Sequence, residues 1–197
     1  MGLHARRRGR REARRDVHLL ELPAHHPGLP PRASANDPPP RTIAGDATGL
    51  LEIEDIGYDE ANDAIVVMDN HLTVRRFART ARGNIAPLTS LTVPNGTTAI
   101  AADNFNGELL VAATDAVAVY RFADDGQAAP VRTLSGITGA QGLLVDTDAD
   151  QLFVLDDFGS MLHVFPRTAS RAAAPLRTLN AAQGAFACEG FRMAICN

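Results

Sequence analysis

The chain repeats one short phrase four times, as RTIAG (41–45), LTSLT (88–92), VRTLSG (131–136) and LRTLN (176–180). Each copy directly follows a proline, and these prolines are 47, 43 and 45 residues apart. After each of the first three copies comes an apolar run broken by acids and turn residues, then a second apolar run. The first of these runs reads IEDIGYDEANDAIVVMDN (53–70), TAIAADNFNGELLVAATD (98–115) and QGLLVDTDADQLFVLDD (141–157). The chain is therefore an internal repeat with a period of about 45 residues, and such repeats decide the architecture.

Each unit predicts four short β-strands. The segments 73–77, 117–122 and 161–165 alternate as half-buried strands do. The turns between strands carry residues that tolerate tight backbone, and Asn106-Gly107 is the strongest hairpin signal among them. No segment shows a sustained helical period. An all-β fold made of four-stranded antiparallel repeats with this period is typical of β-propeller blades.

Counting strands predicts three complete blades and a partial fourth, in residues 41–87, 88–130, 131–175 and 176–197. In the partial blade, Gln183-Gly184 repeats Gln141-Gly142, so AFAC and MAIC match an innermost and a second strand. A third strand is missing there, and only residues 41–45 could supply the outermost one. The array either closes as a strained ring of four blades or stays open. We expect the open array, whose blade edges would self-associate.

The phrases RTIAGDATGL (41–50), FARTARGNIAP (77–87) and APLRTLN (174–180) resemble blades of the bacterial NHL-like and lactonase-like propellers. The resemblance spans residues 41–197 and rests on structural positions. It implies a propeller fold and an extracytoplasmic location. Members of this group include lactone hydrolases, a lyase of cyclic peptide antibiotics and many binding scaffolds. This chain departs from them in having too few blades, so it is either a piece of a larger propeller or a protomer completed by another copy.

Residues 1–40 differ in composition from the rest. They hold eight Arg, four acids and seven of the 12 Pro, which predicts a disordered basic tail. They contain no apolar run long enough for a signal peptide or a membrane-spanning helix, so no membrane association is expected. An Arg-rich arm can bind nucleic acid, but a solvated tail is the preferred interpretation. A start codon assigned too far upstream would explain the same composition and would hide a signal peptide, so the sequence leaves the localisation open.

The candidate binding site lies in the loops after the second strand of each unit. In propellers these loops open on the face where the central channel usually binds ligands. Several oxygen ligands around one axis would suit a divalent cation such as Ca²⁺, although solvated loop residues are the simpler interpretation. The candidate ligand-binding residues are Asp69, Asn70, His71, Asp115, Asp156 and Asp157, of which Asp69, Asp115 and Asp156 are the candidate metal ligands.

A second group of acids lies between the first and second strands of each unit. Asp146, Asp148, Asp150 and Asp157 superficially match a calcium-binding loop. However, Gln151 replaces the glycine that such a loop needs, and the other units lack the pattern. We therefore expect ordinary hairpin turns here.

The leading functional hypothesis is a non-catalytic module that binds a protein or a small molecule on the propeller face. The alternative is a metal-dependent hydrolase or lyase of the lactonase-like kind, in which the cation polarises a carbonyl. Both hypotheses rest on analogy, because a fold does not define a function. The inner strands are expected to form the core between blades, through Ile56, Ile100, Leu143 and Val145, with Val66, Val111 and Val154 behind them.

Overall fold

A computed structural model describes residues 17–19, 39–156 and 161–180. Three four-stranded antiparallel sheets, each built from consecutive strands, and one two-stranded sheet form in this part of the chain. It contains no α-helix, only the 3₁₀ turn η1 (Asp46–Thr48). The four-strand repeat predicted from the sequence is confirmed. The sheets comprise β3 (Ile53–Asp59), β4 (Ala64–Asp69), β5 (Thr73–Ala78) and β6 (Thr89–Thr92); β7 (Ala99–Asp103), β8 (Glu108–Ala113), β9 (Ala116–Arg121) and β10 (Arg132–Ser135); and β11 (Ala140–Asp146), β12 (Gln151–Asp156), β13 (Met161–Pro166) and β14 (Arg177–Asn180).

In each four-stranded sheet, an aspartate at the end of the first strand stabilises the hairpin between the first and second strands. The carboxylates of Asp59 and Asp103 accept hydrogen bonds from the backbone and side-chain amides of Asn62 and Asn106. Asp146 accepts two backbone N–H groups from its own turn. Such local bonds mimic a backbone turn and fix the hairpin. The predicted hairpins are confirmed.

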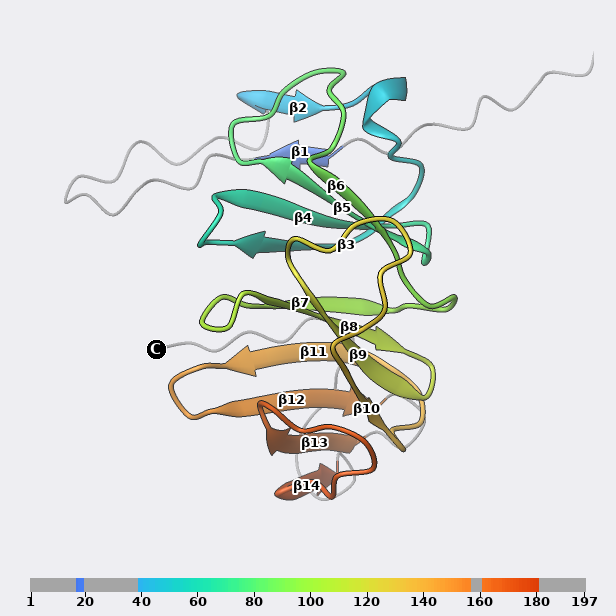
Figure 1. Ribbon diagram of the computed structural model, residues 1–197, viewed down its shortest axis with the longest axis vertical. Helices are drawn as coiled ribbons and strands as arrows, with labels where there is room; N and C mark the ends of the chain where they lie inside the picture. Colours follow the sequence, from blue (N-terminus) through green and yellow to red (C-terminus); the bar gives the residue numbers. More distant parts are fainter. Residues whose placement is uncertain (1–16, 20–38, 157–160, 181–197) are drawn as a thin grey trace, which may run out of the picture.

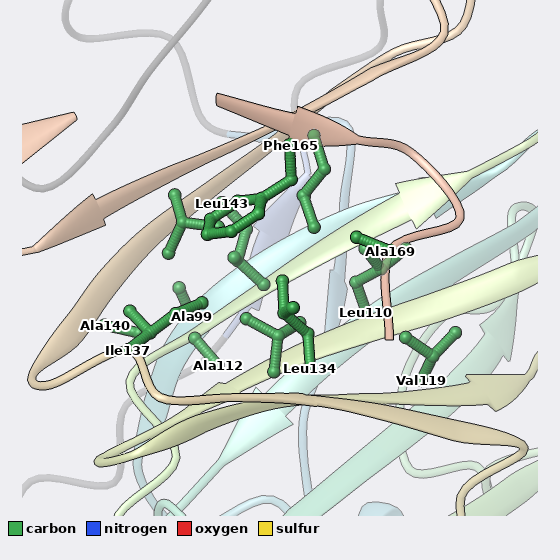
Figure 2. Packing of buried hydrophobic residues seen from close by; sticks show 13 residues of the cluster. Ala99, Leu110, Ala112, Val119, Leu134, Ile137, Ala140, Leu143, Phe165 and Ala169 are labelled. Carbon is green, nitrogen blue, oxygen red and sulfur yellow. The ribbon is translucent and has the colours of Figure 1, made fainter. Parts of the chain in front are cut away.

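The sheets stack in chain order along the longest axis of the molecule (Figure 1). Their first strands meet in succession, β3 against β7 and β7 against β11. Two apolar cores fill the junctions between sheets, and Figure 2 shows the one between the second and third sheets. Side chains of neighbouring sheets interdigitate there, including Leu110, Leu134 and Val119 against Leu143 and Phe165.

Most of the predicted core residues are confirmed. Ile100, Leu143, Val66, Val111 and Val154 are buried, and Val145 is partly buried against the second core. The prediction is wrong for Ile56, which is 37% exposed. This side chain lies on the face of the first sheet that turns away from the second sheet.

A recurring contact joins the outermost strand of one sheet to a loop of the next. Leu91 pairs in parallel with Gly126, and Leu134 with Arg171. The N–H of Gly126 donates to Ser90 O at 3.1 Å, and the N–H of Arg171 donates to Thr133 O at 2.6 Å. The first and second sheets are therefore each joined at their outer edge to the following sheet, in addition to the apolar packing.

The first sheet makes the same kind of contact with a strand that precedes it in the chain. Strand β2 (Arg41–Ile43) bonds to Gly83 of the first sheet, with Gly83 N donating to Thr42 O at 2.7 Å. Strand β1 (Val17–Leu19) pairs antiparallel with β2. Residues 1–40 were expected to lack regular structure, and β1 corrects that expectation for its three residues, because backbone pairing with β2 satisfies their hydrogen bonds. Nearly all of the remaining tail, and the predicted partial blade beyond residue 180, lie outside the described residues.

Candidate functional site

The loop between β4 and β5 presents two of the predicted site residues. Asn70 and His71 are exposed and adopt left-handed backbone, with φ of 54° and 53°. The loop is closed by a bond from Leu72 N to Asp69 O. Among residues other than glycine, Asn and His are enriched in this conformation. The tight turn therefore holds both side chains at the end of the first sheet, where they face solvent.

Asp69, at the end of β4, has a structural role. It is 1% exposed, and its Oδ1 accepts the N–H groups of Leu51 and Glu52 at 2.7 Å each. Its Oδ2 forms an ion pair with the guanidinium of Arg75. Both carboxylate oxygens are thus engaged in holding the segment before β3 against β4. A cation at Asp69 would have to displace these bonds.

His71 connects the first sheet to the segment that leads into the second. Its Nδ1 is 2.8 Å from Thr97 O, so Nδ1 carries a proton and donates to that carbonyl. Its Nε2 lies 3.2 Å from Glu54 Oε1, and its side chain is 47% exposed. The imidazole is oriented from both sides and still accessible to a ligand.

The corresponding loop of the second sheet lies across the same segment. Thr114 and Asp115 form a two-residue turn between β8 and β9, and both are exposed. Thr114 O accepts the N–H of Gly139 at 2.6 Å. A Cβ atom placed on Gly96 would meet Thr114 Oγ1 at 3.2 Å. Residues 94–97 therefore lie between His71 and Thr114, and we call the surface formed by residues 70–72, 94–96 and 114–115 the polar loop surface.

Asp156 and His163 face each other in the third sheet. Asp156 ends β12 and is 8% exposed, with His163 Nε2 at 3.6 Å from its Oδ2. His163 Nδ1 also lies 3.1 Å from Thr178 Oγ1 on the neighbouring strand. Asp157 lies outside the described residues. Within residues 39–156 and 161–180, no three His, Cys, Asp or Glu side chains come together in a group that could hold a metal ion. Asp69, Asp115 and Asp156 do not form such a group there.

Two buried ion pairs at the junctions between sheets were not predicted, one within the first sheet and one between the second and third sheets. Arg76 donates to Asp59 Oδ2 and, across the first junction, to Phe122 O, at 2.7 Å in each case. Arg167, from the third sheet, reaches back to Asp103 Oδ2 of the second at 2.7 Å. The repeated aspartate after each first strand was the available signal. The sequence indicates only its role in the turn, because nothing local shows which arginine approaches it.

A third ionic cluster lies at the exposed end of the first sheet. Tyr58 and Arg79 both donate to Asp63. These bonds lower the pKa of the Asp63 carboxyl below its ordinary value, the bond from Tyr58 contributing most. The bond to Asp63 raises the pKa of the Tyr58 phenol, since the neutral phenol is the donor.

Comparisons with known proteins support the fold alone. A functionally unknown protein from Desulfotomaculum acetoxidans has a similar structure, with a TM-score of 0.54 and 14% sequence identity over 72% of this chain. This chain spans 46% of the length of that protein. Hsv2 from Kluyveromyces lactis aligns with a TM-score of 0.47 and 8% identity, over 66% of this chain and 36% of Hsv2. No protein-family model and no curated protein matches the sequence. In the described part of the chain, no helix is long and apolar enough to cross a membrane.

Proposed function

We propose that this chain is a non-catalytic binding module made of NHL-like propeller blades, which recognises a protein segment or a polar small molecule at the polar loop surface. The proposal rests on a difference between neighbouring polar side chains at this end of the sheets: one is bonded within the protein, and the others are exposed to solvent. The Asp69 carboxylate accepts two backbone N–H groups and forms an ion pair, whereas Asn70, His71 and Asp115 remain exposed on tight turns. Loops held by a rigid scaffold are a common position for binding residues.

The available groups favour hydrogen-bonding ligands. The Asn70 amide both donates and accepts, and the Asp115 carboxylate accepts. His71 is held between Glu54 and Thr97 O, so its position requires no ordering when a ligand arrives. Preorganisation of this kind reduces the cost of binding. We therefore expect recognition of amide, hydroxyl or amine groups, as in an extended peptide or a polar metabolite.

The test is a binding screen on the purified chain with a peptide array and a panel of amines, amides and sugars, followed by calorimetry on each hit. The double variant N70A/H71A and the single variant D115A should weaken binding about tenfold or more, since each removes direct hydrogen bonds. Asp148→Ala, an exposed acid on the hairpin at the other end of the third sheet, should leave affinity unchanged. Equal affinity in all variants would reject this surface as the binding site. Stoichiometric Ca²⁺ or Zn²⁺ in the purified protein, with lactone hydrolysis lost in D115A, would favour the hydrolase alternative.

A further inference from the structure

The connection between the first and second sheets carries an Asn-Gly pair on a tight turn. This connection runs from β6 to β7 (Figure 1), and Asn95 and Gly96 are its turn residues. Gly96 has a φ of 79°, in the left-handed region that residues with a Cβ atom avoid. The Thr97 hydroxyl donates to Pro94 O at 2.7 Å and closes the turn. The Asn-Gly pair therefore has a defined place on the polar loop surface.

The side chain of Asn95 is exposed and free to rotate. Among residues 17–19, 39–156 and 161–180, none accepts a hydrogen bond from its amide or donates one to it. In the same part of the chain, the backbone N–H of Gly96 has no backbone acceptor. The amide carbon of Asn95 and the backbone nitrogen that follows it are therefore both available to react with each other.

The chain has a second Asn-Gly pair, Asn106-Gly107, whose asparagine is held. Asn106 Nδ2 donates to Asp103 Oδ2 at 2.9 Å, and its backbone N–H donates to Asp103 Oδ1 at 3.1 Å. Asp103 is fully buried, and Arg167 binds its Oδ2 at 2.7 Å. Gly107 also has a positive φ, of 66°. The two pairs thus share their sequence and the backbone region of their glycine, but they differ in the freedom of the asparagine side chain.

An Asn-Gly pair can undergo an intramolecular substitution. The backbone nitrogen of glycine loses its proton and attacks Cγ of asparagine, which forms a C–N bond and closes a five-membered succinimide. The bond from Cγ to Nδ2 breaks, and the nitrogen leaves as ammonia with the proton. Water then opens the ring at either carbonyl and gives aspartate or isoaspartate, so the net reaction converts an amide and water into a carboxylic acid and ammonia. Glycine favours the attack because it has no Cβ atom to shield its nitrogen.

We propose that Asn95 is a site of spontaneous deamidation in the folded protein, with water as the only co-reactant, and that the fold protects Asn106 from the same reaction. The attack requires the asparagine side chain to rotate until Cγ faces the next backbone nitrogen. Asn95 can do so without breaking a hydrogen bond to a described residue. Asn106 must first give up its bonds to the Asp103 carboxylate, and hydrogen bonds to a charged group are among the strong ones.

The product changes the polar loop surface in two ways. Either acid places a negative charge where a neutral amide stood, on the surface that already exposes Asp115. Isoaspartate also adds one methylene to the backbone before Thr97, whose carbonyl accepts from His71 Nδ1 at 2.8 Å. The added charge should favour cationic ligands over anionic ones. This effect on binding rests on the proposed function, whereas the deamidation itself does not.

Tandem mass spectrometry tests the proposal on the purified full chain, kept at mildly alkaline pH and sampled over time. The acid formed at each of the two positions is measured in proteolytic peptides. In the folded protein, Asn95 should react about tenfold or more faster than Asn106, because the bonds to Asp103 must break first. The same chain in urea is the matched control, and both pairs should react there at similar rates. Asn95→Gln should abolish the fast reaction while keeping an amide at this position.

The comparison between the two pairs decides the outcome. An intact Asn95 in the aged protein, or Asn106 reacting as fast as Asn95 in the folded state, would overturn the proposal. A difference that persists in urea would do the same, because it would then come from neighbouring residues in the sequence and not from the fold. Aged protein that carries the acid at position 95, yet binds an amine or amide from the binding screen with unchanged affinity, would reject the polar loop surface as the binding site. The modification site would remain established in that case.

Discussion

The junction between the first and second sheets and the junction between the second and third share their apolar pattern but differ in their polar contacts. At the first, Arg76 pairs with Asp59 of its own sheet and bonds across to Phe122 O. At the second, Arg167 reaches back from the third sheet to Asp103 of the second. The turn positions each of these two aspartates, while the arginine comes from the same sheet at Asp59 and from the following sheet at Asp103. The repeat therefore places the carboxylates of Asp59 and Asp103 at the junctions, while the arginine partner differs between them.

The largest expected effect comes from leaving one of these carboxylates without its cation. Arg167→Met should destabilise the protein by about 3–5 kcal/mol, because Asp103 is fully buried and would lose its ion pair. Denaturant unfolding measures the change. Adding Asp103→Asn should recover part of the loss, since the amide can still accept from the turn at Asn106. Arg76→Met should cost a similar amount. A much smaller loss there would show that the first junction depends less on its ion pair.

A smaller effect separates a leucine within a junction from its counterpart on the third sheet. Leu134→Ala should cost about 2–5 kcal/mol, because it opens a cavity in the second core. Leu179→Ala, at the same register position, should cost less than about 1 kcal/mol, because this side chain is 42% exposed. Thermal unfolding measures both. Equal losses would mean that Leu179 is as buried in solution as Leu134.

The backbone of the connecting loops offers a finer comparison. Gly126 and Arg171 occupy equivalent positions with φ of 59° and 56°, a conformation that costs a residue with a Cβ atom about 1–2 kcal/mol. Arg171→Gly should therefore stabilise the protein by up to about 1 kcal/mol, after the entropy that glycine adds to the unfolded chain. Gly126→Ala should destabilise it by about 1 kcal/mol, although no atom lies within 4 Å of the added Cβ. Urea midpoints of the two variants would show the opposite signs.

The smallest effect concerns the exposed cluster of Tyr58, Asp63 and Arg79. Because the pKa of Asp63 is lowered in the folded protein, its contribution to stability is present above the ordinary carboxyl pKa. That contribution disappears as the pH falls through the lowered pKa. Melting temperatures of the wild type and Asp63→Asn, measured from pH 7 to about pH 2, should therefore converge at the acid end. A constant difference over this range would show that the Asp63 charge contributes nothing.

Much of the fold is predictable from the sequence. The features that are not predictable depend on contacts between segments far apart in the chain. The strands, their order and the hairpins at Asn62 and Asn106 follow from alternation and turn chemistry within a few residues. The sequence predicts Ile56 as a core residue alongside Ile100, and only its place on an outward face explains its exposure. Asn70 and His71, which the sequence places in a loop, are exposed on a tight turn. In the sequence, Asp69 has the same loop position as Asn70 and His71. In the structure, its carboxylate accepts hydrogen bonds from the backbone N–H groups of residues 51 and 52.

By itself, the sequence determined the repeat, the four strands of each unit and the turn aspartates, because these depend on interactions between residues close together in the chain. Only the tertiary structure decided which arginine neutralises which buried aspartate, since Arg167 and Asp103 come from different sheets. It also decided that β1 pairs with β2, although the two strands are far apart in the chain. Burial is a property of what packs on a face. Leu134 and Leu179 therefore have the same local sequence, RTL, and opposite environments.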